Sequence, residues 1–100
     1  MRPISRRPSG AWELSVADTR TVEVRYFAAA AEAAGRAKED LHLTAAATVA
    51  DLHDVLADKY GAAMTRILGV AAFLVGDELT RDRGQLLGDR VDVLPPFAGG

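Results

Sequence analysis

The sequence predicts an α+β domain in which a mixed sheet of four to five strands packs on one main helix plus short helices. Three observations predict this fold. Short segments with alternating apolar residues indicate strands, one longer segment repeats its apolar residues at helical spacing, and glycine or Gly-Asp turns separate the segments. Their order is strand, short helix, strand, long helix and three further strands, which is typical of a two-layer arrangement. With 49% hydrophobic and 26% charged residues, a 100-residue chain suits one such domain.

The chain divides into a leader, a domain and a tail. Residues 1–20 show no sustained period and hold two prolines, so we expect a flexible leader, in which Trp12, Leu14 and Val16 could add a strand by alternation. Residues 21–94 form the expected domain, and residues 95–100 an extended C-terminal Gly-Gly tail.

The first strand is expected over residues 21–27. Val22, Val24 and Tyr26 share one face there, and Phe27 belongs to the other. Phe27 therefore either lies exposed, as an interface residue would, or forms a second core layer under the short helix.

Two further segments complete the first half of the domain. Residues 28–34 are rich in alanine and predict a short helix, and Gly35 suits a left-handed cap. Residues 40–44 alternate, with Leu41 and Leu43 inward, and predict a strand that pairs with the first.

The main helix is expected to begin after Thr48. Thr48 and Asp51 match a capping box, and Gly61 ends the segment. The apolar residues in between recur at helical spacing: Val49, Leu52, Val55, Leu56 and Tyr60. Residues 62–68 are expected to form a short helix that carries Met64 and Ile67 into the core.

The last third predicts three strands. Residues 70–79 indicate two strands around Gly76-Asp77, of which residues 71–75 are apolar on both faces and are expected to be central. Leu86 and Leu87 are expected to return to the core, before a last strand over residues 90–94.

The composition and motifs exclude several classes of function. Residues 21–100 contain eight Lys/Arg and twelve Asp/Glu, a net charge of −4, so nucleic-acid binding is not expected. The longest apolar stretch is far below the roughly 20 residues that span a membrane. The absence of cysteine removes thiolate chemistry and fits a cytoplasmic protein. The two histidines stand outside any metal-binding pattern, no phosphate-binding loop or nucleophile motif is present, and we expect neither a metal site nor an enzyme.

The remaining chemical feature is the C-terminus. Pro95 and Pro96 end the last strand and stiffen the exit from the fold, and Gly99 and Gly100 are narrow enough to enter a partner's channel. The Gly100 carboxylate becomes reactive toward sulfur once a partner that uses ATP converts it to an acyl-adenylate. The tail is therefore the candidate reactive group of the chain.

The chain resembles the small, sulfur-carrying subunit of molybdopterin synthase, in the ubiquitin-like β-grasp superfamily. The likeness runs from Val22 to Gly100 and is carried by Tyr26-Phe27-Ala28, by Glu32 and Gly35, by Gly88-Asp89 and above all by the sequence VDVLPPFAGG of residues 91–100. The chain differs at Ala31, where the family often has arginine, and at Gly76, where it often has asparagine.

The resemblance implies a carrier rather than an enzyme. Gly100 would be adenylated by an E1-like enzyme, thiocarboxylated by a sulfur donor system and inserted into the large synthase subunit, within a heterotetramer, to build the dithiolene of molybdopterin. The carrier itself would bind no cofactor, and ATP would be used by the activating partner. The resemblance assigns partner contacts to Phe27, Leu79 and Leu94, and to the tail residues Pro95, Pro96 and Phe97.

Three alternatives remain open from the sequence. The chain could carry sulfur for thiamine, cysteine or tRNA thiolation, it could be a ubiquitin-like modifier joined to lysines through Gly100, or it could be an interaction domain whose tail does no chemistry.

Overall fold

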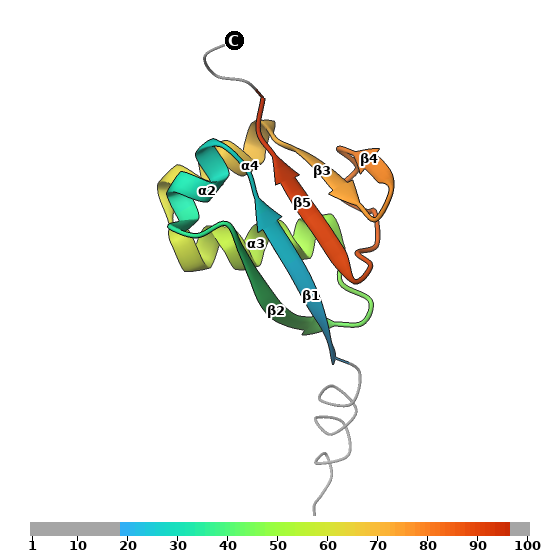
Figure 1. The fold of residues 1–100 in the computed structure, drawn as a ribbon. Coiled ribbons are helices and arrows are strands. Elements are labelled where there is room, and N and C mark those ends of the chain that lie inside the picture. The colour runs from blue at the N-terminus through green and yellow to red at the C-terminus, as the bar shows by residue number, and fades with distance from the viewer. Residues whose placement is uncertain (1–18, 97–100) are drawn as a thin grey trace, which may run out of the picture.

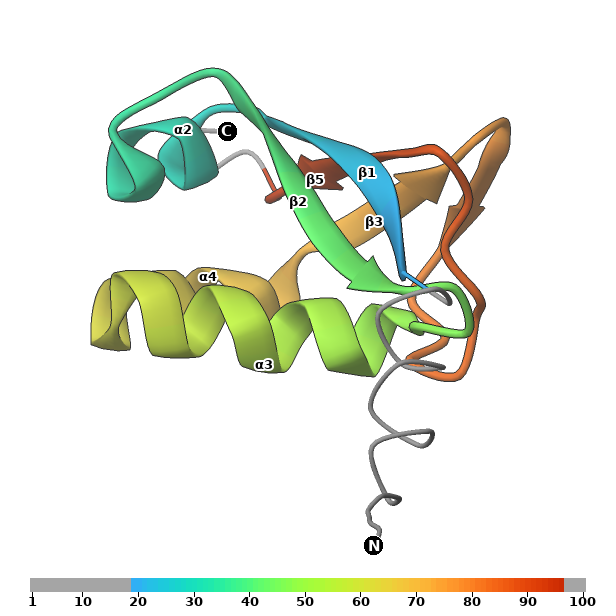
Figure 2. The same ribbon diagram turned by 90° about the horizontal axis from the view of Figure 1, so that it is seen from below.

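The computed structural model describes residues 19–96, which form a five-stranded mixed sheet with helices on one side (Figures 1 and 2). The strand order is β2-β1-β5-β3-β4. This is the expected α+β class, and the β-grasp arrangement is confirmed. The strand expected at Trp12 to Val16 lies outside the described residues.

The first hairpin places β1 (Thr19–Tyr26) against β2 (Lys38–Thr44) in antiparallel register, with Val22 opposite Leu41. Both strands begin two residues earlier than expected, because backbone pairing extends over Thr19 opposite Thr44 and Arg25 opposite Lys38. Period-two alternation of apolar residues identifies the buried middle of a strand better than its polar ends.

Two helices, one short and one long, begin or end where local sequence signals predict. The short helix α2 (Ala29–Ala34) ends at Gly35, whose φ of 73° is left-handed, as expected, and whose N–H donates to the Ala31 carbonyl. The long helix α3 (Val49–Tyr60) begins with the expected capping box: the Thr48 N–H donates to Asp51 Oδ2 at 2.9 Å, and the Asp51 N–H donates to Thr48 Oγ1 at 3.3 Å.

The helix α4 (Ala62–Val70) runs two residues further than expected, so Val70 is helical and the following strand is shorter. Met64 is buried as predicted, but Leu68 rather than Ile67 is its buried companion; Ile67 is only partly covered. The spacing of four residues between Met64 and Leu68 keeps both on the helix face that meets the sheet.

The strands β3 (Ala72–Val75) and β4 (Glu78–Thr80) form the hairpin predicted at Gly76-Asp77, and Gly76 has a positive φ of 61°. The middle of the sheet is β5 (Arg90–Leu94), which is parallel to β1 and antiparallel to β3. As expected, the strand within residues 71–75 is internal to the sheet, because β3 pairs with β5 on one side and with β4 on the other. After β4 the chain passes the start of α3, where the Ala50 N–H donates to the Arg83 carbonyl, and then enters the sheet between β1 and β3 as β5.

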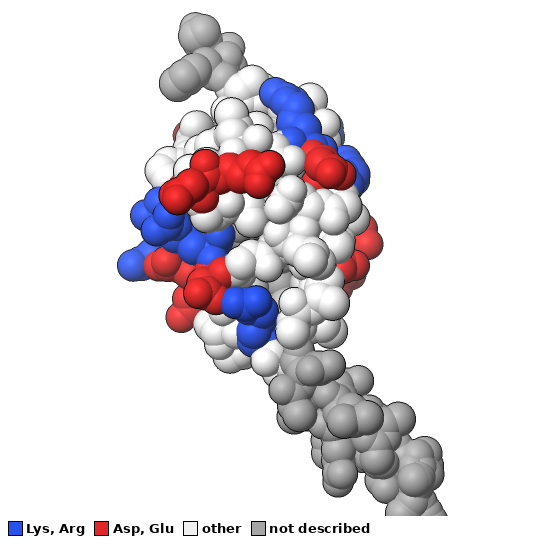
Figure 3. Space-filling view, turned by 90° about the vertical axis from the view of Figure 1, so that its right-hand side faces the viewer, with Lys and Arg blue, Asp and Glu red and all other residues white. Residues whose placement is uncertain are grey.

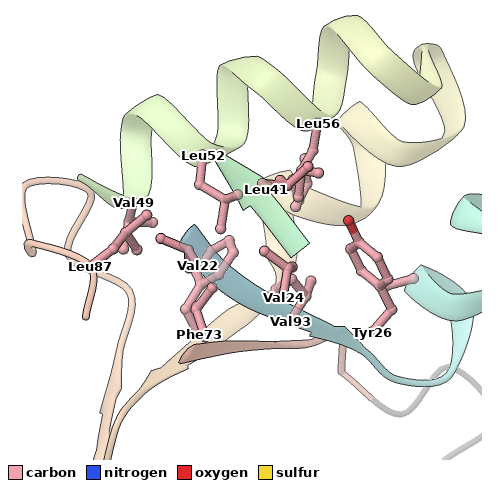
Figure 4. Packing of buried hydrophobic residues seen from close by; sticks show 14 of the residues in the cluster. Val22, Val24, Tyr26, Leu41, Val49, Leu52, Leu56, Phe73, Leu87 and Val93 are labelled. Atoms are coloured by element: carbon pink, nitrogen blue, oxygen red, sulfur yellow. The ribbon is translucent and has the colours of Figure 1, made fainter. Parts of the chain in front are cut away.

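One core fills the space between the sheet and the helices. Figure 4 shows Leu52 and Leu56 of α3 directed toward Val22 and Val24 of β1. Leu87 joins this core, whereas Leu86 is 57% exposed, contrary to expectation. Leu86 pairs with Thr48 in an isolated bridge, and neighbouring extended residues point to opposite sides, so only one of the two leucines can face the core.

A polar cluster fastens β2 to α3 at one end of the core. Glu39 of β2 has a side chain that is 5% exposed; its Oε2 accepts hydrogen bonds of 2.5 Å from the hydroxyls of Tyr26 and Tyr60, and its Oε1 accepts one of 2.6 Å from Lys59. The two tyrosine rings meet edge to face at 6.2 Å. Burial acts to raise the pKa of Glu39, but the hydrogen bonds from Lys59, Tyr26 and Tyr60 outweigh it and lower the pKa. We call Glu39, Tyr26, Tyr60 and Lys59 the Glu39 cluster.

Among residues 19–96, no helix has both the length and the apolar character needed to cross a membrane.

Candidate functional site: the outer sheet face and the exit of the tail

The sheet face opposite the helices, here called the outer face, carries the alternate residues of each strand. Val91 and Val93 point into the core, so Asp92 and Leu94 belong to the outer face. The register places Leu74 of β3 between Asp92 on one side and Leu79 of β4 on the other. The outer face is the surface that no described helix covers (Figure 2).

The structure brings the three predicted contact residues in the domain to this face. Phe27, which follows β1, is 42% exposed, Leu79 of β4 is 63% exposed, and Leu94 of β5 is partly exposed. The exposure of Phe27 rules out a second core layer at that position. Large apolar side chains that gather on one open face are typical of a protein-binding surface. Their role in binding remains a prediction.

A charged pair lies between these apolar residues. The Nε and Nη2 atoms of Arg25 donate to the two carboxylate oxygens of Asp92 at 2.8 and 2.9 Å. Asp92 is only 3% exposed, while the Arg25 side chain is 38% exposed and covers it. The centroid of the Phe27 ring lies 5.9 Å from the Arg25 guanidinium, which is within the range of a cation–π contact.

The environment keeps Arg25 charged. Its hydrogen bonds to Asp92 raise the pKa of the guanidinium, and the charge of Asp92 adds to this against the opposing effect of burial. The sequence analysis missed this pair, although alternation alone puts Arg25 and Asp92 on outer positions of their strands. Pairing them requires the parallel register of β1 and β5, which joins residues 67 positions apart.

Next to Leu79 the outer face has an open hollow. It has a volume of about 320 Å³ and is lined by Ala72, Leu79, Thr80 and Arg81. The Arg81 Nη1 donates to the backbone carbonyl of Val70 at 3.1 Å, which fixes the guanidinium at the end of α4. Arg81 therefore borders the apolar part of the outer face, opposite Arg25.

The tail leaves the domain beside this hollow. Leu94 is paired with Ala72, which lines the hollow, and the chain continues through the partly exposed Pro95 and the exposed Pro96. Figure 1 shows β5 leading to the end of the sheet at which β3 begins. Phe97, Gly99 and Gly100 lie outside the described residues. Four residues beyond Pro96 can reach roughly 14 Å when extended.

The described residues hold no group of three or more metal-ligand side chains. His42 is exposed, with its Nδ1 3.2 Å from Thr21 Oγ1. Seen from the β4 side, acidic and basic side chains are interspersed with uncharged surface, and neither sign forms a continuous patch on the side shown (Figure 3).

The family model described as the ThiS family matches residues 24–100. The solution structure of the HVO 2177 protein of Haloferax volcanii is similar, with a TM-score of 0.69 at 27% identity over 83% of this chain and 89% of that chain. The crystal structure of SAMP1 from Haloferax volcanii gives a TM-score of 0.68 at 28% identity, over 81% of this chain and all of that chain.

A third similar structure is a complex. It contains subunits 1 and 2 of molybdopterin-converting factor from Helicobacter pylori; the TM-score is 0.54 at 28% identity, over 81% of this chain and 100% of that chain. No curated protein matches the chain significantly.

Proposed function

This chain belongs to the ThiS family, and from that membership we propose that it is the sulfur carrier subunit of a molybdopterin synthase. One observation carries the proposal. The middle strand of the sheet ends beside an open apolar face, and the chain then runs through two prolines to a terminal Gly-Gly. A partner seated on that face would receive the tail directly.

The chemistry is that of an activated carboxylate. A Gly100 carboxylate oxygen attacks the α-phosphorus of ATP bound by an E1-like enzyme, and pyrophosphate leaves. Hydrosulfide from a sulfur donor then attacks the acyl carbon, AMP leaves, and a thiocarboxylate remains. The carrier supplies the unhindered terminus and the recognition surface, whereas the partner supplies the nucleotide site. Because activation consumes ATP, we place the carrier in the cytoplasm.

The similar solved structures and the tail together support a proposal for the acceptor of the sulfur. A similar protein has been solved in complex with subunit 2 of molybdopterin-converting factor, and this supports a large-subunit partner for the present chain. Phe27, Leu79 and Leu94 on the outer face, with Pro95 and Pro96 at the exit, would contact that subunit. Phe97 and Gly99 would enter its channel, and sulfur would pass from Gly100 to the pyranopterin precursor.

The intact mass of the chain tests the first step. Incubation with ATP, hydrosulfide and the activating enzyme of the same genome should exchange one oxygen for one sulfur, confined to Gly100. A chain that lacks Gly100 is the matched control and should keep its mass. An unchanged mass of the full chain, under conditions in which the enzyme forms adenylate on its known carrier, would contradict the proposal.

The acceptor needs its own experiment. The thiocarboxylated chain should support formation of molybdopterin when mixed with the large subunit and the cyclic precursor. Transfer of sulfur instead to a thiamine, cysteine or tRNA pathway enzyme would keep the carrier function and replace the acceptor.

A second candidate function is protein modification. The similarity to SAMP1, at 28% identity over 81% of this chain, favours it. A modifier would appear in cell extracts as conjugates of higher mass that contain Gly100 linked to a lysine. A carrier would leave no such conjugates.

A further inference from the structure

The outer face exposes large apolar side chains, and it also carries two arginines whose guanidinium groups are held by hydrogen bonds within the domain. Arg25 lies on β1 beside Phe27, and Arg81 lies just after β4 beside Leu79. Leu74 and Leu94 lie on the strands in between. Any surface that covers Phe27, Leu79 and Leu94 together must therefore also cover or border both guanidinium groups.

A partner that covers Arg25 must supply an acceptor for the N–H groups of its guanidinium. Asp92 accepts from Nε and Nη2, so the remaining N–H groups of the guanidinium have no carboxylate partner within residues 19–96. At 38% exposure of the side chain, water satisfies them in the free protein. A partner that removes this water without an acceptor oxygen would leave buried donors unpaired, which is costly.

Arg81 requires a charged group on the partner, because its own charge is not paired. Its guanidinium donates to the Val70 carbonyl, and within the described chain no carboxylate lies in ion-pair range of it. The neighbouring Asp82 directs its Oδ1 to the Gly84 N–H at 2.9 Å and forms no ion pair with Arg81. Arg81 therefore keeps an uncompensated positive charge at the rim of the apolar hollow.

Resting on the proposed function, we infer that the large-subunit partner presents an apolar surface with two polar groups: an acceptor oxygen opposite Arg25 and a carboxylate opposite Arg81. Both guanidiniums are held in place before binding, Arg25 by Asp92 and Phe27 and Arg81 by Val70. Little side-chain entropy is then lost on docking, and the two groups fix the orientation in which the tail enters the partner.

The first test compares two arginines of one loop. Arg81→Gln removes the rim charge, and Arg83→Gln removes the same charge from an exposed residue whose carbonyl accepts from Ala50 of α3, on the helix side. Calorimetry with the purified large subunit should show Kd raised by roughly tenfold or more for Arg81→Gln, and less than about twofold for Arg83→Gln. Equal effects of the two substitutions would overturn the carboxylate assignment.

The second test distinguishes a partner surface that has an acceptor oxygen opposite Arg25 from one that is apolar there. The double variant R25L/D92L replaces the ion pair by apolar side chains, and we expect it to keep the fold because both charges are removed together. If the partner offers an acceptor oxygen to Arg25, the variant binds roughly tenfold more weakly, because that oxygen is buried without a donor. If the partner surface is apolar there, the variant binds equally well or more tightly, and the inference fails.

Leu79→Asp separates this inference from the proposed function. It should abolish binding if the outer face is the interface, whatever the arginines do. Binding by the wild type and loss in Leu79→Asp, together with unchanged affinity in Arg81→Gln and R25L/D92L, would sink the inference alone. No binding of the wild-type chain to the large subunit would instead contradict the proposed function. Thermal unfolding of each variant, followed by circular dichroism, identifies any loss that comes from unfolding.

Discussion

At the scale of single residues, Asp92 is the most informative side chain. It is a 3% exposed carboxylate on the sheet face opposite the helices, and Arg25 is its ion-pair partner. A buried charge pair contributes little net stability, but a buried charge without its partner is strongly unfavourable. The two residues are therefore unequal, since Arg25 is partly hydrated and Asp92 is not.

This inequality predicts an order of stabilities. Arg25→Leu leaves the Asp92 carboxylate buried and unpaired, so it should lower the urea midpoint of unfolding most. Asp92→Leu leaves Arg25, which can turn into water, and should lower the midpoint less. The double variant R25L/D92L should lie nearest to the wild type. An Asp92→Leu variant less stable than Arg25→Leu would show that Arg25 is the more deeply buried partner.

At the scale of elements, the Glu39 cluster is the connection between the edge strand β2 and the end of α3. Glu39→Ala should lower the free energy of unfolding by about 2 kcal/mol, because it removes charge-assisted hydrogen bonds and leaves two partly buried hydroxyls without their acceptor. Chemical denaturation at neutral pH measures this loss. Asp54→Asn, on the exposed side of α3, is the control and should change the stability little.

The same cluster predicts how stability depends on pH. The pKa of Glu39 is lowered in the fold, so its contribution is present above the unfolded value of about 4.3 and is lost as pH falls through the lower folded value. Burial and the hydrogen bond to Glu39 raise the pKa of Tyr26 above the range of ordinary tyrosines, so stability also falls as pH rises past about 10. Glu39→Gln should flatten the acid limb of a stability profile. An acid limb as steep as that of the wild type would contradict this assignment.

The start of α3 gives a prediction that sequence alone supports. Thr48→Ala removes the side chain that accepts from the Asp51 N–H, and it should lower the free energy of unfolding by about 1 kcal/mol. Urea denaturation measures it. Thr48→Ser, which keeps the capping oxygen, should stay close to the wild type; an equal loss in both would mean that the threonine methyl group, rather than the cap, stabilises the helix start.

The elements that sequence reasoning predicted correctly are those with local causes. The capping box at Thr48, the left-handed Gly35 and the turn at Gly76 depend on neighbouring residues only. The errors concern which side chains face the core: Leu68 is buried in place of Ile67, and of Leu86 and Leu87 only Leu87 is buried. Alternation also could not tell that β5 occupies the middle of the sheet. For the site, the outer position of Phe27 followed from alternation, whereas the Arg25–Asp92 pair needed the parallel register.

At the scale of the whole molecule, stability and proposed chemistry occupy different parts of the chain. The buried hydrophobic cluster runs from Val22 to Val93 and lies between the sheet and the helices, while the outer face and the exit at Pro95 lie on the opposite side and at one end. Changes to the tail should therefore affect the chemistry without affecting the fold.

Removing Gly100 tests this separation directly. Among residues 19–96, none beyond Val93 belongs to the core, so the melting temperature should change by less than about 1 °C. Acceptance of sulfur should be abolished, because the new terminal carboxylate on Gly99 is one residue, roughly 3.5 Å, short of the activating site. Binding to the large subunit through the outer face should be largely retained.

Adding one further glycine is the matched control. It keeps the chemistry of the terminus but shifts the terminus by the same distance, and it should also block sulfur transfer. Normal transfer by either variant would mean that the partner does not measure the position of the terminus, and a large drop in melting temperature would mean that the tail belongs to the folded domain.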